Sequence, residues 1–595
     1  MRDTNTWPLL IACLASMALG SCVEVASPTE TIALETHVTD WRDEVIYQVL
    51  VDRFANGDLN NDYNVNLEAP ARYHGGDWQG LIDRLGYLEA LGVTALWISP
   101  VVKNVEEDAG VSGYHGYWTQ DFGAVNPHFG DMYKLRELVD ACHARGMKVI
   151  LDIVTNHVGQ LFYYDINGNG QPDEAVFGGG DGTSPVTHVS EYDPDFDPQG
   201  IQSETSLGQA GPAEIRFFHV PELNRMPPEP PEFQNPDWYN RMGRVWDWNH
   251  AEQVLLGDFP GGLKDLKTTH PDVRTALIEA FARWVEIADF DGFRIDTLKH
   301  VEHDFWEEFC PAIRARLARH GKTNFFLFGE AFDGDDALIG SFTFNGGVDS
   351  VFQFAQKFQI YDDVFKYGAP TQKVADLLAL RGEHYGTEAH PGGVVDAEGN
   401  GLLPTQVLVN FIENHDIPRF LYDAPDLAAF HSALFHLLTF DGIPSLYYGS
   451  EQEFSGGNDP HNREDLWDTG YATDGATFEH IARLTALRRE LAPLRRGNLT
   501  LRWTTSHVSD EEDAGILAFE RAYAGKTVLV VLNVHDSHVS RTATGVEAMA
   551  TSFPEGTVLR DVFAATEETF TVGQDGRVDI ATPPRTGRIL VPDGE

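Results

Sequence analysis

Short apolar runs alternate with segments of helical periodicity through most of this chain. Lys148–Val154 is almost uniformly apolar, whereas Pro271–Ala288 repeats its apolar residues at the spacing of one helical face. This alternation predicts parallel strands joined by crossover helices, and eight such units close a (β/α)8, or TIM, barrel of the α/β class. The predicted strands are Val45–Val51, Val93–Ser99, Lys148–Val154, Phe290–Asp296, Phe325–Gly329, Val348–Phe354 (the weakest), Val407–Ile412 and Ile443–Tyr448. Helices are predicted over Gln79–Leu91, from Asp131 to Gly146, and over Pro271–Ala288.

Two regions break this alternation. Residues 158–262 are rich in Gly, Pro and Asp, and the region is too long for an ordinary loop, so we predict an inserted, extended subdomain after the third strand. Residues 494–595 contain short alternating runs such as Thr527–Asn533 and Thr557–Val562, which predict a C-terminal antiparallel β-sandwich domain. The catalytic barrel is then expected to comprise residues 41–157 and 263–493, preceded by a polar tether at 23–40.

The first 22 residues have the pattern of an export segment. Arg2 precedes an apolar core from Trp7 to Leu19, which is too short to span a membrane permanently. The sequence Leu19-Gly20-Ser21-Cys22 resembles the lipobox of bacterial lipoproteins, in which the cysteine is acylated and becomes a lipid anchor. The alternative is an ordinary cleaved signal with an incidental cysteine. Both interpretations predict an exported protein, either a membrane-anchored lipoprotein or one secreted to the periplasm or the medium.

Charge narrows the range of partners. The 595 residues include 43 Lys and Arg against 91 Asp and Glu, a formal net charge of −48. Such a surface repels nucleic acid and anionic membranes, so we exclude nucleic acid as a partner. A neutral substrate or a divalent cation is compatible with the charge, and we expect a monomer. Cys142 lies on the apolar stripe of a predicted helix and is interpreted as a core thiol, so no disulfide framework is expected.

The candidate chemistry collects where predicted strands end. Arg294 and Asp296 are two residues apart on one strand and therefore share a face. That stretch alone is also compatible with a structural ion pair. Acids and histidines at four strand ends, without a serine or cysteine nucleophile motif, favour a carboxylate-driven site of the kind that cleaves glycosidic bonds. The four ends are Asp152–His157, Arg294–Asp296, Phe328–Glu330 and Glu413–Asp416.

These four segments resemble, in order and spacing, the signature regions of the α-amylase family of glycoside hydrolases (family 13). The resemblance extends from about Val45 to Tyr471. Further matching segments are Gly75–Gly80, Tyr114–Trp118 and Gly457–Glu464, and the last two are similar to those of fungal-type α-amylases. Overall the motifs are similar to those of fungal-type and bacterial secreted α-amylases.

The resemblance implies roles for particular residues. Asp296 matches the nucleophile, Glu330 the general acid/base and Asp416 a third acid that stabilises the transition state. Arg294 is expected to hold Asp296 ionised. Asp152 matches a residue that supports the site from behind and takes no catalytic step. The implied substrate contacts are Tyr117, as a stacking platform, His157 and His415, Lys299 and His300 on the leaving-group side, and Asp459 and Arg463 on the other side.

The resemblance also implies calcium. One site would use Asn156, the backbone carbonyl of His300 and Asp265, which we prefer to a second candidate segment at Pro221–Asn224. A second would use Asn56, Asp58, Asn61, Asp62 and Asp77, as in cyclodextrin glucanotransferases and neopullulanase-like relatives; the alternative is an Asn/Asp-rich turn. A third would use Asp165, Asn167, Asn169 and Asp173. It begins like an EF-hand loop, but Val176 stands at the twelfth position, so a solvated turn remains the alternative.

The function that the resemblance implies is retaining endo-hydrolysis of α-1,4-glucosidic bonds in starch, glycogen or malto-oligosaccharides. A related α-glucan transglycosylase, or a maltogenic or cyclodextrin-acting enzyme, is the first alternative. The pair Lys299-His300 favours an amylase or transglycosylase over a cyclodextrin-degrading enzyme, and a single β domain after the barrel argues against a cyclodextrin-forming one. A remote alternative is a non-catalytic glucan-binding lipoprotein.

Overall fold

The structure is a computed structural model that describes residues 30–108, 110–165, 170, 175–177, 187–189, 214–243, 245, 247–259, 261–564 and 568–594. The predicted export segment at 1–22 lies outside these ranges, as do residues 23–29 of the tether. In the described part of the chain, every helix is too short or too polar to cross a membrane.

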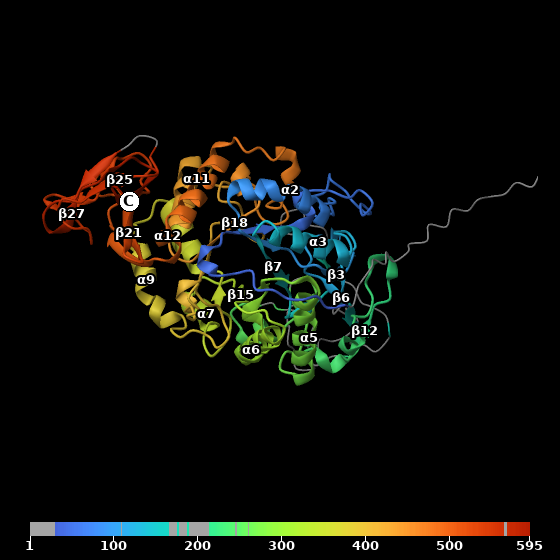
Figure 1. The fold of residues 1–595 in the computed structure, drawn as a ribbon. Helices are drawn as coiled ribbons and strands as arrows, with labels where there is room; N and C mark the ends of the chain where they lie inside the picture. The colour runs from blue at the N-terminus through green and yellow to red at the C-terminus, as the bar shows by residue number, and fades with distance from the viewer. Residues whose placement is uncertain are drawn as a thin grey trace, which may run out of the picture.

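Eight parallel strands form the centre of the molecule (Figure 1). They are hydrogen-bonded in the order β16-β15-β14-β7-β2-β1-β18-β17, and a parallel bridge between Phe352 and Val409 joins the two edges. This nearly closed barrel confirms the predicted fold, including the weak strand, which is only two residues long. The strands are β1 (Ile46–Val49), β2 (Ala95–Ile98), β7 (Lys148–Ile153), β14 (Gly292–Ile295), β15 (Phe326–Gly329), β16 (Ser350–Val351), β17 (Val409–Phe411) and β18 (Ile443–Tyr447).

Helices surround the barrel, and local sequence explains where they begin and end. α5 begins at Pro271, whose missing N–H costs nothing at a first helical position, and it ends where Asp289 adopts a left-handed conformation at φ 61°. α3 begins after Asp131, whose side chain accepts a hydrogen bond from Lys134 N. It ends at His143, three residues before the predicted Gly146. The helices are α1 (Val51–Phe54), α2 (Trp78–Leu91), α3 (Met132–His143), α5 (Pro271–Ala288), α6 (His303–Arg319), α7 (Asp336–Ser341), α8 (Phe354–Gln356), α9 (Gln372–His384), α10 (Leu427–Thr439), α11 (Ala476–Glu490) and α12 (Ala492–Arg496).

The insert leaves the barrel after β7 and returns beside its own starting point. β8 (His157–Val158) pairs antiparallel with β13 (Lys264–Asp265), so the described ends of the insert are hydrogen-bonded neighbours. A second pairing joins β9 (Phe162–Tyr164) to β12 (Ile215–Phe217). The other described elements of this region are β10 (Ala175–Phe177), β11 (Thr187–Val189), α4 (Ala251–Leu256) and three 3-10 helices, η2 (Pro221–Leu223), η3 (Pro231–Gln234) and η4 (Pro236–Trp238).

The C-terminal domain is antiparallel, as predicted, and lies at one end of the molecule (red in Figure 1). Strand β20 is apolar on both faces because each face packs into a different core. Leu517 and Phe519 join the core shared with the barrel, whereas Ile516 and Ala518 join a second core inside the domain. The main sheet has the order β19 (Asn498–Trp503), β20 (Ile516–Tyr523), β21 (Lys526–Asn533), β29 (Thr586–Pro592), β25 (Val558–Asp561), β26 (Thr569–Thr571). The smaller sheets pair β22 (Ser540–Arg541) with β28 (Ala581–Thr582) and order β23 (Ala543–Thr544), β24 (Glu547–Ala550), β27 (Arg577–Val578).

Candidate active site

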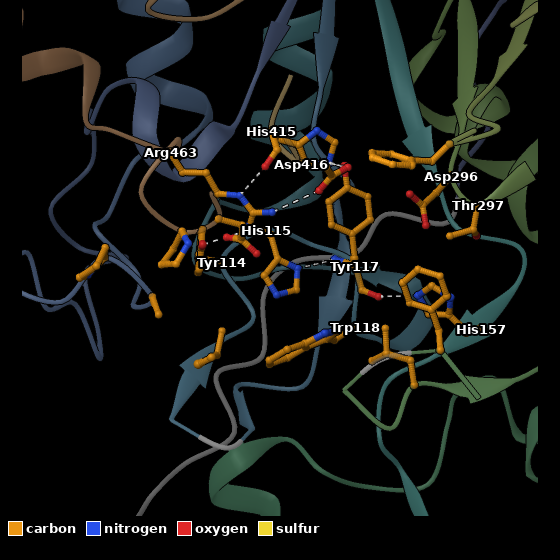
Figure 2. A pocket seen from close by; sticks show the side chains of 18 of the residues that line it. Tyr114, His115, Tyr117, Trp118, His157, Asp296, Thr297, His415, Asp416 and Arg463 are labelled. Atoms are coloured by element: carbon orange, nitrogen blue, oxygen red, sulfur yellow. Dashed lines mark hydrogen bonds and ion pairs between the residues drawn. The ribbon is translucent and has the colours of Figure 1, made fainter. Parts of the chain in front are cut away.

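A cavity of about 630 Å³ opens at the carboxyl ends of the barrel strands. Nine of the predicted site residues line it, and Figure 2 shows several of them pointing into a common space. Of the other predicted catalytic and substrate-binding residues, Arg294 lies behind the cavity wall and Lys299 points elsewhere, and neither lines the cavity. The lining residues from the predicted set are Tyr117, His157, Asp296, His300, Glu330, His415, Asp416, Asp459 and Arg463.

Arg294 on β14 is the centre of the site. Its side chain is fully buried, and Nη1 donates to Asp152 Oδ1 at 2.9 Å, Asp152 Oδ2 at 3.0 Å and Asp296 Oδ1 at 2.9 Å. The other terminal nitrogen, Nη2, contacts Glu330 Oε2. Three carboxyl groups from three adjacent strands therefore share one guanidinium. An isolated structural Arg–Asp pair does not describe this arrangement.

Burial has a larger effect on the acids than the sequence suggests. The pKa of Asp296 is raised mainly by desolvation, and the negative charge of Asp416 adds to this, while Arg294 opposes both. The pKa of Asp416 is raised for the same first reason, against Arg463 and Arg294. Arg294 therefore limits the rise at Asp296 and does not cancel it, contrary to our expectation. Burial therefore opposes the ionisation of both acids, and the guanidinium groups of Arg294 and Arg463 favour it.

Asp152 holds the cluster from behind the cavity wall. Besides Arg294, its Oδ2 accepts hydrogen bonds from Tyr117 Oη at 2.9 Å and from Trp97 Nε1 at 3.1 Å. The donors to this carboxylate are buried or half-buried protein groups, and Asp152 does not line the cavity. Its position is that of a residue that orients Arg294 and Tyr117.

Two histidines and one tyrosine form one wall of the cavity (Figure 2). The Tyr117 ring stacks on His415 with centroids 5.3 Å apart, and Tyr117 O lies 3.2 Å from His157 Nε2. Burial lowers the pKa of His157 to about 3 and that of His415 well below its usual value, so both rings are neutral. Gln48 Nε2 donates to His415 Nδ1 at 2.7 Å, which places the ring proton on Nε2, 3.3 Å from Asp416 Oδ2.

Arg463 joins several residues of the cavity wall. It reaches Asp416 Oδ1 at 3.4 Å and Asp459 Oδ1 at 2.9 Å, and its Nη1 donates to Tyr114 Oη at 3.0 Å. Its Nε donates to the carbonyl of His415 at 3.1 Å. The guanidinium is thus held by protein groups, and it fixes the position of Asp416 relative to Asp459.

The neighbours Lys299 and His300 separate in space. They belong to a 3-10 turn, η5 (Leu298–His300), which follows Thr297 in a left-handed conformation at φ 50°. Lys299 Nζ contacts the carbonyl of Phe332 and lies 3.3 Å from Asp333 Oδ2, and Lys299 is not among the residues that line the cavity. The His300 ring lines the cavity, and its Nδ1 lies 3.0 Å from the carbonyl of Val254. Only one of the two predicted leaving-group contacts therefore faces the cavity.

Several aromatic lining residues were not predicted. Phe259 meets the edge of His300 at a centroid distance of 5.1 Å, and Phe332 is 41% exposed at the mouth. In the sequence these phenylalanines have the pattern of core residues, so nothing identified them. Tyr114, His115 and Trp118 also line the cavity, and here a signal existed, because they flank Tyr117 within one matching motif.

The first predicted calcium site has a buried carboxylate, Asp265, beside the strand end that carries Asn156. Asp265 is 2% exposed, and its Oδ2 accepts a hydrogen bond from Asn240 Nδ2 at 2.6 Å. Burial raises its pKa well above the usual value, with added repulsion from Asp258 and Glu302. Within the described residues no lysine or arginine pairs with this carboxylate. Asn156 lies on the adjacent strand end, and its carbonyl accepts from Leu266 N.

These donors fit a calcium ion. A buried carboxylate beside an amide and further acids is the oxygen-rich environment that calcium prefers. Lys264 next to Asp265 does not obstruct it, because Lys264 Nζ pairs with Asp258 Oδ2 at 3.0 Å. If calcium is held by Asn156, Asp265 and the carbonyl of His300, it would tie the insert to the barrel.

In the second predicted calcium loop, both carboxylate oxygens of Asp77 already accept hydrogen bonds from protein groups. Asp77 caps α2, with Oδ1 accepting from Gly80 N at 2.7 Å and Gly57 N at 3.1 Å. Its Oδ2 accepts from Asp58 N at 2.8 Å and Asn61 Nδ2 at 3.2 Å. Asp77 therefore organises the loop through hydrogen bonds.

The other members of this loop do lie together. Asn56 Nδ2 is 2.9 Å from both carboxylate oxygens of Asp62, and Asn61 Oδ1 is buried without a hydrogen-bond partner among the described residues. An unpaired buried amide oxygen beside acids fits a cation ligand. The loop thus combines both interpretations, an Asn/Asp-rich turn and an oxygen cluster that suits calcium.

The third predicted loop is largely untested, because Asn167, Asn169 and Asp173 lie outside the described residues. Asp165 is described: it pairs with Arg216 Nε at 3.2 Å. A different group, not predicted from the sequence, offers ligand atoms within 4.8 Å of one another: His37, His143 and Asp289. It lies at the amino ends of the barrel strands, away from the acid cluster.

Comparison with known proteins identifies the family. The model described as "Alpha amylase, catalytic domain" matches residues 48–481, and "Alpha amylase, C-terminal all-beta domain" matches 507–593. α-Amylase 2 of Schwanniomyces occidentalis is 30% identical over 544 residues, covering 90% of this chain and 89% of that protein.

Two solved structures are similar over most of their length. The α-amylase of Geobacillus thermoleovorans in complex with acarbose has a TM-score of 0.67 at 26% identity, over 93% of this chain and 99% of that one. CldA, a cyclomaltodextrin glucanotransferase with three domains, has a TM-score of 0.68 at 26% identity, over 92% and 98%. With a family model matched over most of its residues, the chain belongs to the α-amylase family of glycoside hydrolases (family 13).

Proposed function

We propose that the protein is an α-amylase that hydrolyses internal α-1,4-glucosidic bonds of starch-like glucans with retention of configuration. The observation that carries this proposal is the guanidinium of Arg294, which contacts both Asp296 and Glu330 at the floor of one cavity. Two carboxyl groups bound to one guanidinium lie close together, and close spacing favours direct attack by a carboxylate over attack by an interposed water. The full-length similarity to a fungal α-amylase supports the same substrate class.

In the proposed reaction Glu330 donates its proton to the glycosidic oxygen while a carboxylate oxygen of Asp296 attacks the anomeric carbon. The bond to the leaving sugar breaks with its electron pair, and a glycosyl ester of Asp296 forms. Water then attacks the same carbon, Glu330 takes up its proton, and the ester bond breaks to restore the Asp296 carboxylate. Asp416, held by Arg463 and facing His415 Nε2, supplies negative charge opposite the oxocarbenium-like centre.

A related α-glucan transglycosylase is the second candidate. It would form the same glycosyl ester and transfer it to a sugar hydroxyl. The similarity to CldA favours this candidate, and it removes one argument against it: a glucanotransferase of three domains is covered over 98% of its length by this chain. The presence of one C-terminal β domain therefore does not distinguish the two activities.

Product analysis on soluble starch distinguishes these functions. We expect a rapid fall in viscosity, linear malto-oligosaccharides, and release of the α-anomer at first, observed by proton NMR. Predominantly cyclic products would assign the transglycosylase.

Replacing the nucleophile tests the mechanism itself. Asp296→Asn should lower kcat by at least about 1,000-fold, because the amide cannot form the ester. Asp363→Asn, a half-exposed acid paired with Lys373, is the matched control and should leave kcat unchanged. Starch hydrolysis retained in Asp296→Asn would refute the assignment.

We also propose that the protein is exported and acts as a monomer, with Cys22 acylated in the lipoprotein form. Labelling with a radioactive fatty acid in the producing cell should mark the wild type and leave Cys22→Ser unlabelled. A soluble, unlabelled wild type with an N-terminus elsewhere would favour the ordinary signal peptide. Sedimentation of the mature protein tests the monomer.

A further inference from the structure

A second cavity lies at the end of the barrel opposite the acid cluster, where the barrel meets the C-terminal domain. Its volume is about 530 Å³. One part of its wall precedes strand β18 at Asp441 and Gly442, and another comes from strands β19 and β20. The charged residues of the wall are Arg42, Arg381, Asp441, Arg495, Arg496 and Arg521. A wall with five arginines and one acid is unexpected in a chain whose net charge is −48.

Nearby aspartates neutralise only some of these cations. The ion pairs are Arg42 with Asp40 at 2.7 Å, Arg495 with Asp43 at 2.6 Å, Arg381 with Asp441 at 2.6 Å, and Arg496 with Asp43. Three aspartates thus serve four arginines.

Two further arginines have no acidic partner among the described residues. Arg521 is 1% exposed and donates to the carbonyls of Thr439 at 3.0 Å and Gly497 at 2.9 Å. Arg488, directly behind the wall, donates to the carbonyl of Gly442 at 2.9 Å. Burial and neighbouring arginines lower the pKa of Arg488 to about 9, and burial lowers that of Arg521 to about 10. Six arginines against three aspartates leave a local excess of positive charge at this cavity.

One guanidinium nitrogen of the wall residues lacks a hydrogen-bond partner among the described residues. Arg495 Nε is buried without a hydrogen-bond partner among the described residues, although the same side chain reaches Asp43 through Nη1. A fork of N–H donors on fixed arginines matches the oxygens of a phosphate group. The wall also contains apolar residues, which are Ala375, Leu378, Ala379, Leu499 and Leu501.

We propose that this cavity binds a phosphate group, as inorganic phosphate or as a phosphomonoester, and that the bound anion fastens the C-terminal domain to the barrel. A doubly charged oxyanion offsets the excess charge better than a halide or a single carboxylate does. The volume exceeds that of a bare oxyanion, and the apolar residues of the wall accommodate the organic part of an ester. This site is independent of the proposed glucan hydrolysis.

Thermal unfolding and calorimetry of the full chain test the proposal. Inorganic phosphate, compared with sodium chloride at equal ionic strength, should raise the Tm in a saturable way, because a ligand of the folded state stabilises it. Calorimetry should give one phosphate per chain. Tighter binding of glucose 6-phosphate than of inorganic phosphate would identify the ester as the ligand, and equal or weaker binding would identify the free anion.

Two variants and one control make the test specific. Arg495→Gln should weaken phosphate binding by about tenfold, since it removes a charge-assisted donor. Arg541→Gln, which removes an exposed arginine of the C-terminal domain paired with Asp579, should bind as the wild type does. Ala379→Glu places a carboxylate at the exposed rim on helix α9, so it should raise the Tm without phosphate and abolish the response to it.

The contrary results are equally clear. A Tm rise that does not saturate and is equal in the wild type and all three variants would be a general salt effect, and the proposal would be wrong. If Arg495→Gln does not fold, Ala379→Glu decides alone: an unchanged response to phosphate in that variant overturns the proposal.

Discussion

At the scale of single residues, the site depends on one arginine that serves three acids. Arg294 fixes Asp296 and Glu330 relative to each other, and Asp152 fixes Arg294. Burial raises the pKa of Asp152 and of Asp296, and the guanidinium of Arg294 opposes that rise at both. A residue behind the wall can therefore control the rate without touching the sugar.

Asp152→Asn tests this control. We expect kcat to fall by about 100-fold with KM changed less than about threefold, because the amide no longer holds Arg294 by two charge-assisted bonds. Tyr117→Phe, which loses a single bond to Asp152 and keeps its ring on His415, should lower kcat by about tenfold. Steady-state kinetics on a malto-oligosaccharide measure both. A large rise in KM at constant kcat in Asp152→Asn would show that Asp152 binds the sugar.

At the scale of elements, much of the fold follows from the sequence. The bounds of α5 were predicted without error, because Pro271 and the end of the apolar stripe mark both ends. The paths of Lys299 and His300 could not be predicted, because they depend on the left-handed turn at Thr297, where a threonine gives no signal. Phe259 and Phe332 were missed because exposure at a cavity mouth has no periodic signature.

The N-terminal caps of helices α2 and α3 should differ in their contribution to stability. Asp131→Ala removes an ordinary cap from α3 and should cost about 1 kcal/mol. Asp77→Ala removes the α2 cap together with the acceptor for Gly57, Asp58 and Asn61, so it should cost about 3 kcal/mol. Urea denaturation compares the two variants. Equal losses would mean that the loop donors find other partners.

Helix α10 carries a prediction about pH. Burial lowers the pKa of His436 to about 3, and its Nε2 has no hydrogen-bond partner among the described residues. Between pH 6.5 and 3 the unfolded chain binds a proton at this residue and the folded chain does not, so acid destabilises the fold here. His436→Phe removes this effect and keeps an aromatic ring beside Phe440.

Lowering the pH from 7.5 to 5 should reduce the unfolding free energy of the wild type by about 2 kcal/mol more than that of His436→Phe. Denaturant titrations at both pH values measure it. Parallel losses of stability in the two proteins would show that His436 is protonated in the folded state.

At the scale of the whole molecule, two candidate ion sites lie where separate parts of the chain meet. Asp265 and Asn156 lie where the insert meets the barrel, and the arginines around Arg521 lie where the C-terminal domain meets it. The sequence indicated the first through a motif. The sequence could not indicate the arginine-lined cavity, because its arginines come from distant segments and lie together only when the C-terminal domain packs against the barrel.

Chelation tests the first junction. Excess EDTA should lower the Tm of the wild type by about 4 °C, because calcium bound to the folded state alone stabilises it. Asp265→Asn should have a lower Tm and lose most of this response. Asp237→Asn, an exposed acid of the insert paired with Arg241, should respond as the wild type does. An unchanged wild-type Tm in EDTA would remove calcium from this junction.

The pairing of β8 with β13 has a consequence for how such enzymes diversify. Because His157 pairs with Asp265 and Val158 pairs with Lys264, the first and last residues of the insert are held together by one short antiparallel strand pair. A segment whose ends are neighbours imposes no strain on its host, and the entropic cost of lengthening it grows only slowly. The insert is thus a cassette that can be exchanged or extended while the acids on β14 and β15 stay in register. Substrate preference and catalytic chemistry can therefore change separately in this architecture.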